Sequence, residues 1–255
     1  MPKKRKRRRR RGGLGRLLRP LSVILAAGAV VAALTLFFKV ETIEVVGAGR
    51  YRAEEIISAS GVEIGDNLIL LNRYRISQQI YTSLPYITDV HPRPKFPSTL
   101  LIEITETRPV AAIRGAGGYW LVSGSGKLLE AVDEPTAGDY LLITGVEAVS
   151  PAVSEPLRLP EESPVTPDRL LELLNVMSEK DALTRADSID CSDSRILVIN
   201  YDGRFRVEMY YDADFSFKIA GLVHVVNEKL QPNETGILRM TFDNNDVHLI
   251  PFSGE

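Results

Sequence analysis

The longest apolar run of the chain lies near its N-terminus. Residues 21–38 (LSVILAAGAVVAALTLFF) contain no charged side chain. As an α-helix, which rises about 1.5 Å per residue, this run would be about 27 Å long, close to the ~30 Å hydrocarbon core of a bilayer. The pattern therefore predicts a single transmembrane helix over residues 20–39.

Beyond residue 40, apolar residues recur at the spacings of strands and helices in turn. The predicted order is strand, helix, helix, strand, strand, at residues 40–47, 53–60, 76–84, 86–90 and 100–105. Gly61 is placed to end the first of these helices and Pro85 the second. Pro92 and Pro94 can lie only at a sheet edge or in an irregular strand, because proline donates no ladder hydrogen bond.

The rest of the chain has the pattern of a mixed β-domain with packed helices. Strands are predicted at residues 119–122, 127–129, 140–143, 188–191, 196–201, 204–211, 237–242 and 247–251. Two helices are predicted from apolar stripes, at Leu170, Leu171, Leu174 and Met177, and at Ile219, Leu222, Val223, Val226 and Leu230. Asp202-Gly203 predicts a tight hairpin turn, and the five prolines within residues 147–167 predict a mobile surface loop. The predicted fold class is α+β.

These patterns divide the chain into four parts. They are a basic tail over residues 1–19, the transmembrane helix over 20–39, a first outer module over 40–109 and a second over 110–255.

Charge changes sign where the apolar run ends. Residues 1–39 carry 12 basic and no acidic residues, which leaves 19 basic and 33 acidic residues, a net charge of −14, in residues 40–255. Basic residues beside an apolar span hold that side in the cytoplasm and attract anionic lipid. Arg16, Arg19 and Lys39 are the basic residues nearest the predicted span. The acidic outer part has no broad positive field, so no nucleic-acid partner is expected.

Two other interpretations of the N-terminus remain open. The nine consecutive basic residues 3–11 also resemble a nuclear-localisation or nucleic-acid-binding patch. Residues 27–29 (AGA) offer a cleavage site for a signal peptide, but only residues 21–26 of the apolar run would precede the cut. A retained anchor with its N-terminus in the cytoplasm is therefore the expectation.

No motif indicates an enzyme, a cofactor or a metal site. The three histidines and the lone Cys191 match no zinc spacing and no nucleophile–base arrangement, and Cys191 is expected to be a small packing residue. Residues 124–127 (GSGK) resemble part of a phosphate-binding loop. Leu121 and Leu128 stand, however, where that motif needs a glycine and a hydroxyl residue.

Several stretches resemble one bacterial family. GVEIGDNLILLN (61–72), LPYITDV (84–90) and KFPSTLLIEITETRPVAAI (95–113) are similar to the POTRA module of cell-division proteins of the FtsQ/DivIB family. RILVINYDGRFRVEM (195–209) and the closing GILRMTF and VHLIPF stretches are similar to the C-terminal β-domain of the same family. The resemblance implies a POTRA domain of βααββ order over residues 40–109 and a β-domain over 110–255.

The resemblance also implies a function. It suggests a non-catalytic, single-pass scaffold at the division septum that binds FtsB/DivIC-like and FtsL-like proteins outside the membrane and coordinates septal wall synthesis. Sheet proteins often bind partners through an unpaired edge strand. The candidate edge is the final hairpin, at Ile237, Arg239, Thr241, Phe242, Val247, His248 and Ile250. These residues could equally form an ordinary core hairpin. An exported wall-binding protein or enzyme that uses the POTRA module as a spacer is the alternative function.

Overall fold

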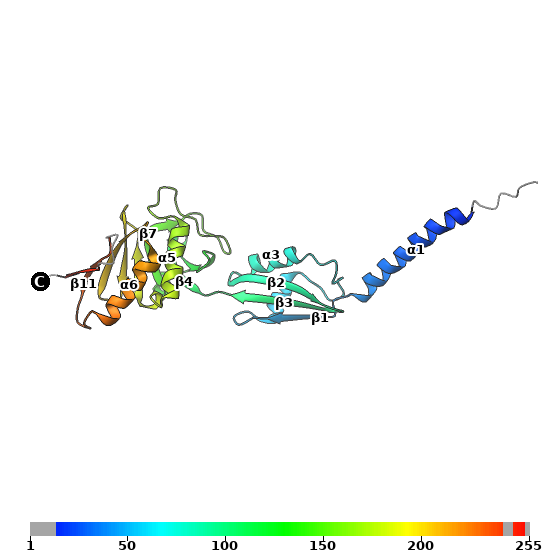
Figure 1. Ribbon diagram of the computed structural model, residues 1–255, viewed down its shortest axis with the longest axis horizontal. Helices are drawn as coiled ribbons and strands as arrows, with labels where there is room; N and C mark the ends of the chain where they lie inside the picture. The colour runs from blue at the N-terminus through cyan, green and yellow to red at the C-terminus, as the bar shows by residue number, and fades with distance from the viewer. Residues whose placement is uncertain (1–13, 242–246, 253–255) are drawn as a thin grey trace, which may run out of the picture.

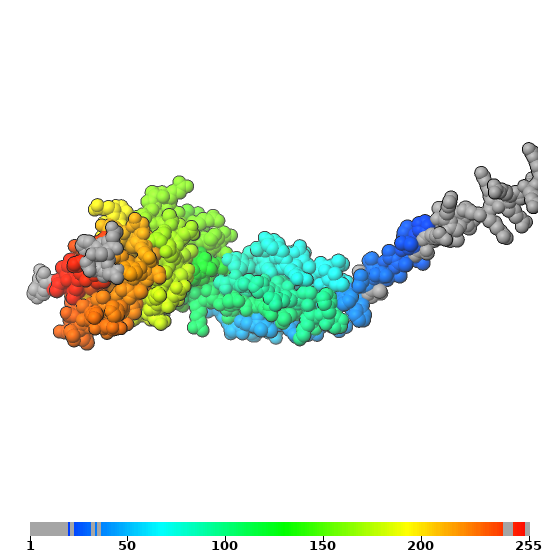
Figure 2. Space-filling view, in the orientation of Figure 1, coloured from blue at the N-terminus to red at the C-terminus, as the bar shows by residue number. Residues whose placement is uncertain are grey.

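The computed structural model describes residues 14–241 and 247–252, apart from some side chains of the first helix. The molecule is elongated, with helix α1 (Leu14–Phe37) at one end, a small three-stranded module in the middle and a nine-stranded sheet at the other end (Figure 1). Figure 2 shows α1 leaving the small module as a separate rod. Within the described residues, no helix has the length and apolar character needed to span a membrane. The transmembrane segment over 20–39 therefore remains a prediction.

The small module has the predicted element order. Its elements are β1 (Thr42–Val46), α2 (Ala53–Ser60), α3 (Arg73–Ser83), β2 (Ile87–Lys95) and β3 (Thr99–Glu106). Strand β3 is central, parallel to β1 and antiparallel to β2. Gly61 ends α2 in the left-handed conformation, as its position predicts. The helices and the sheet enclose one core, in which Leu100, Ile102 and Ile104 face inward from β3.

The two prolines of β2 lie on an edge strand, as expected. Pro92 pairs with Ile102 and Pro94 with Leu100, so the pairing with β3 continues to the end of the strand. A proline on an edge strand leaves no central hydrogen bond unmade, because its nitrogen can face away from the sheet. The irregularity instead falls earlier, between Ile87 and Asp89.

The second module is a single mixed sheet of nine strands. Its order is β12-β11-β10-β9-β8-β7-β4-β5-β6. The strands are β4 (Pro109–Gly115), β5 (Gly118–Ser123), β6 (Leu128–Val132), β7 (Leu141–Ala148), β8 (Ala186–Asp190), β9 (Ile196–Tyr201), β10 (Phe205–Tyr210), β11 (Gly236–Arg239) and β12 (His248–Pro251). The parallel pairs are β4–β7, β7–β8 and β10–β11. Strand β4, which joins the hairpin β5–β6 to the rest of the sheet, has no counterpart among the predicted elements.

Two helices cover one face of this sheet. They are α5 (Pro167–Glu179) and α6 (Phe215–Glu228), which pack beside each other in front of the strands in Figure 1. Thr166 and Asp214 cap them by accepting hydrogen bonds from backbone N–H groups of the first turn. Leu173, absent from the predicted stripe, is buried while Leu171 is only partly so. Two short helices, α4 (Glu134–Ala137) and the 3₁₀ turn η1 (Leu183–Arg185), lie in connections.

The sequence predicts a mobile surface loop over the proline-rich segment, residues 147–167, but hydrogen bonds and buried side chains hold it against the β-domain. Strand β7 extends through Ala148, so the loop begins later than predicted. The Val149 N–H donates to the Arg158 carbonyl, and the Leu157 N–H donates to the Gly126 carbonyl at 2.7 Å. Leu157 and Val165 are buried in the main core. The expectation of a purely surface loop is therefore wrong for these residues, because apolar side chains between the prolines anchor it.

The two modules meet around a buried lysine. Lys127, at the turn between β5 and β6, extends into the small module and is 2% exposed. Its Nζ donates to the carbonyls of Tyr81 at 2.8 Å and Ile87 at 2.9 Å, and lies 3.5 Å from the centre of the Tyr81 ring. Beside it, the Tyr86 hydroxyl donates to the Glu130 carboxylate. The lysine of the GSGK stretch thus joins two modules, and two carbonyl oxygens occupy its ammonium group.

Candidate partner-binding edge

The last strand of the chain is an edge strand. Among the strands that the structure describes, β12 pairs with β11 alone and ends the nine-stranded sheet. It lies at the end of the molecule farthest from α1 (Figure 1). Pro251, within β12, is compatible with this place because an edge strand can lack an N–H donor. The final hairpin therefore forms an edge of the sheet. Strand β12 is an edge strand and not a strand in the middle of the sheet.

The strand register divides the predicted binding residues between two faces. Leu238 pairs with Leu249, and both pack into the core beneath α5 and α6. Because side chains alternate along a strand, the neighbouring pairs face the other way, toward what we call the outer face. Those pairs are Ile237 with Ile250 and Arg239 with His248.

A charged trio occupies the outer face next to the edge. Glu208, in β10, accepts from Arg239 Nε at 3.1 Å and from Arg206 Nε at 3.3 Å. The Glu208 side chain is 10% exposed while both arginines are about four times more exposed. One carboxylate thus orients two guanidinium groups whose remaining donors stay accessible. The outer face near β12 offers two apolar side chains, Ile237 and Ile250, beside fixed positive groups.

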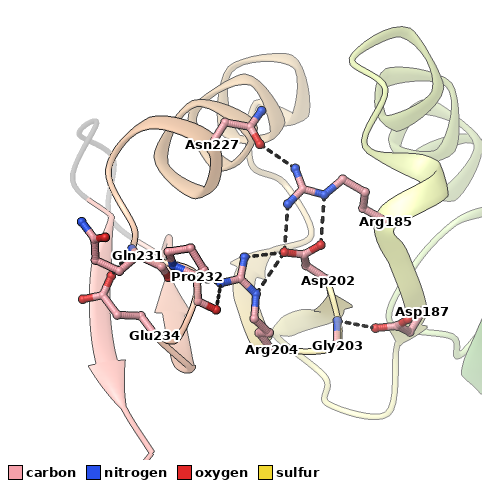
Figure 3. A network of polar contacts seen from close by, with 9 residues as sticks. All are labelled: Arg185, Asp187, Asp202, Gly203, Arg204, Asn227, Gln231, Pro232 and Glu234. Carbon is pink, nitrogen blue, oxygen red and sulfur yellow. Dashed lines mark hydrogen bonds and ion pairs between the residues drawn. The ribbon is translucent and has the colours of Figure 1, made fainter.

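A second network holds the segment that leads into β11 (Figure 3). The Asp202 carboxylate, in the turn between β9 and β10, forms ion pairs with Arg185 and Arg204. Arg204 also donates to the carbonyls of Gln231 and Pro232, just before β11. Arg185 in turn donates to the Asn227 side chain of α6. The turn, the helix and the start of the edge hairpin are therefore tied together through one aspartate.

Asp202 makes this anchoring dependent on pH. The Arg185 guanidinium, with Arg204 beside it, holds the pKa of Asp202 below its usual range. The pKa of this carboxyl group is lower in the folded state than in the unfolded state. The group therefore stabilises the fold at any pH above its unfolded-state pKa, and this stabilisation is lost as the pH falls through its folded-state pKa.

We expect Asp202→Asn to lower the free energy of unfolding at pH 7 by about 1–2 kcal/mol, because charged hydrogen bonds become neutral ones. Urea unfolding at pH 7 and pH 3 measures the effect, and the difference from the unmodified protein should shrink at pH 3. Glu161→Gln, at an exposed carboxylate of the proline-rich segment, is the matched control and should show no loss. An Asp202→Asn deficit that persists unchanged at pH 3 would contradict the electrostatic explanation.

The remaining predicted site residues lie outside strands β11 and β12 or beyond the described chain. Val247 packs against the core, and Thr241 follows β11 in a half-buried position. Phe242 lies outside the described residues, as do residues 1–13 of the basic tail. Arg16 and Arg19 fall within α1, but their side chains are not among the described ones. Lys39 is exposed, and its backbone forms an isolated antiparallel β-bridge with Asn67.

Sequence reasoning did not select Arg206 and Glu208 of the charged trio. The signal was present, since both alternate with Phe205, Val207 and Met209 along a predicted strand. The alternation does not show, however, that β11 pairs in parallel with β10 and so brings Arg239 next to these two residues.

No metal-binding cluster is found within residues 14–241 and 247–252, and the cysteine there is not a reactive thiol. No group of three or more His, Cys, Asp or Glu side chains there is placed to hold a metal ion. Cys191 is buried, and burial raises the pKa of its thiol to about 12. A thiol in that environment stays protonated at neutral pH and is a poor nucleophile.

Comparisons with known proteins agree with this architecture. Residues 38–107 match the family described as "POTRA domain, FtsQ-type". The chain is 36% identical over 112 residues to the cell division protein FtsQ of Geotalea daltonii, covering 44% of this chain and 40% of that protein. It is 33% identical over 105 residues to FtsQ of Corynebacterium glutamicum, covering 41% and 47%. These two matches thus span less than half of either relative.

A longer match is found with clostridial proteins. The chain is 25% identical over 215 residues to the cell division protein DivIB of Clostridium acetobutylicum, covering 83% of each chain. The fold and the free sheet edge define a two-module protein in which a POTRA domain precedes a β-domain. Residues 38–107 thus carry an FtsQ-type POTRA domain, and the chain is similar to cell division proteins named FtsQ and DivIB.

Proposed function

We propose that this chain is a non-catalytic scaffold of the bacterial division machinery. In this proposal it acts at the septum, binds FtsB/DivIC-like and FtsL-like proteins outside the cytoplasmic membrane, and coordinates septal wall synthesis. The observation that carries the proposal is the free edge of β12, at the far end of the molecule from α1. Its relatives are named as cell division proteins, which supports a role in division.

The binding mode we propose is strand addition at β12. A partner strand would complete the hydrogen bonds of the edge, while side chains on the outer face would select the partner. Ile237 and Ile250 provide apolar contact there, and the arginines beside Glu208 favour a partner with acidic side chains. Thr241, Phe242, Val247 and His248 remain proposed contacts around the same hairpin.

We further propose that α1 anchors the chain in the membrane as a single pass with its N-terminus in the cytoplasm. The support is the uncharged run at residues 21–38 and the basic tail that precedes it. Arg16, Arg19 and Lys39 would lie near the two membrane surfaces, where anionic lipid attracts basic groups.

The alternative function is an exported wall-binding protein or enzyme in which the POTRA domain is a spacer. It predicts polysaccharide binding or hydrolysis by the purified protein, and no dependence on the β12 edge. The two proposals therefore differ in what a substitution on the outer face does.

The deciding experiment compares Ile250→Glu with Val149→Glu in the full chain. Each replaces an exposed apolar side chain by a charged one, at β12 and in the proline-rich segment respectively. We expect Ile250→Glu to weaken binding of purified FtsB/DivIC-like and FtsL-like partners about tenfold or more, equivalent to about 1.4 kcal/mol. Val149→Glu should bind normally, and both should keep native circular dichroism. Equal binding by the two variants would contradict the proposed edge.

A further inference from the structure

Four large apolar side chains are exposed at the end of the POTRA domain that faces α1. Ile64, Ile69, Leu70 and Phe96 are between 48% and 73% exposed. We call them the junction patch. Three lie in the connection between α2 and α3, and Phe96 lies in the turn between β2 and β3. Contiguous exposed apolar groups usually mark a surface that is covered in the working protein.

The segments that carry the junction patch contact the residues that directly follow α1. The Leu68 N–H donates to the Phe38 carbonyl at 2.8 Å, and the Gly65 N–H donates to the Val40 carbonyl at 2.8 Å. The rings of Phe38 and Phe96 are in edge contact, with centroids 5.3 Å apart. Phe96 of the patch thus contacts the residue that follows α1, and Phe37 at the end of α1 is also exposed. The exposed Lys39 adds a positive charge to the same junction.

Two arginines that follow Leu70 within five positions of the sequence have no evident role in the fold. Arg73 and Arg75 lie in the first turn of α3, where the helix dipole disfavours positive charge. Both are exposed, and within the described part of the chain neither guanidinium pairs with a carboxylate. Cations next to exposed apolar side chains are the pattern of a surface that lies at a membrane interface, where headgroups carry the negative charge.

We infer that the junction patch rests in the outer interface of the lipid bilayer, with Leu70 and Ile69 among the acyl chains and Arg73 and Arg75 at the headgroups. This inference rests on the proposed anchoring by α1. The POTRA domain would then be fixed in height and tilt on the membrane, and the β12 edge would be held at a set distance from it.

The test places an environment-sensitive fluorophore at single introduced cysteines of the full chain in vesicles of phosphatidylethanolamine and phosphatidylglycerol. The positions are Leu70→Cys in the patch, Leu25→Cys within α1 and Val153→Cys in the distant domain, all three exposed in the structure. Cys191, the only native cysteine, is buried, so the unmodified protein should take no label. Nitroxide groups on the lipid acyl chains quench any fluorophore that lies among them.

The expected result is a blue-shifted emission that lipid nitroxides quench at positions 25 and 70, with neither effect at 153. Quenching at 25 but a water-like emission at 70 would overturn the inference and leave the anchor intact. A blue shift at 70 without lipid quenching would also overturn it, since protein would then cover the patch. A water-like emission at 25 would overturn the anchor and the inference together.

Discussion

Replacing Lys127 by methionine is expected to lower the free energy of unfolding by about 2–4 kcal/mol at pH 7. Methionine fills nearly the same volume but donates no hydrogen bond, so the carbonyls of Tyr81 and Ile87 would be left without the ammonium group that they bind. Tyr81 lies in the last turn of α3, where carbonyls have no partner within the helix and the dipole favours a cation. The lysine therefore supplies what the end of that helix lacks.

Burial explains why Lys127 is a strong test of the contact between the modules. Burial lowers the pKa of Lys127 to about 8, so the side chain is still mainly protonated at neutral pH. It therefore acts there as a charged donor. Around it, Tyr86 of the POTRA domain packs with Leu121 and Leu129 of the β-domain.

The measurement for Lys127→Met is urea unfolding monitored separately in the two modules. Lys180→Met, at an exposed lysine after α5, is the matched control and should change stability by no more than about 0.5 kcal/mol. We expect the methionine variant to unfold earlier and its two modules to lose their common transition. A loss no larger than that of the control would show that the lysine does not join the modules.

The POTRA elements could be predicted because their signals are local. Alternation placed Leu100, Ile102 and Ile104 on the inner face of β3, and Gly61 and Pro85 ended the two helices where short-range backbone rules require. The Asp202-Gly203 turn follows the same logic, since both residues adopt positive φ as such a hairpin needs.

What could not be predicted depends on contacts between distant segments. Strand β4 (Pro109–Gly115) has buried alanines in place of large apolar residues, so it shows little periodicity, and only its pairing with β5 and β7 makes it a strand. Lys127 is a polar residue in a turn, a position normally exposed, and its burial follows from the docking of the other module. The charged trio likewise exists only because β10 and β11 are parallel neighbours.

Gly236, the first residue of β11, decides whether the edge strand can pair at all. A Cβ atom at this position would lie 2.4 Å from the Ile250 carbonyl oxygen and 3.0 Å from its carbonyl carbon. These atoms belong to the backbone of β12, so no side-chain rotation can relieve the contact. Strand β12 is only four residues long and, among the described strands, has no neighbour on its other side, which makes its displacement the easiest response.

We therefore expect Gly236→Ala to detach β12 and to abolish binding of the proposed partners, while the POTRA domain and the rest of the sheet stay folded. Hydrogen exchange should show faster exchange of backbone amides in β11 and β12 alone, and the same binding measurement as for Ile250→Glu reports the partner. Gly117→Ala is the matched control, because that glycine also has positive φ but a Cβ there would meet no atom within 4 Å. The Gly117→Ala variant should lose about 1–2 kcal/mol of unfolding free energy through backbone strain and should bind the partners normally. Normal partner binding by Gly236→Ala, with exchange in β12 unusually fast, would place the interaction elsewhere on the chain.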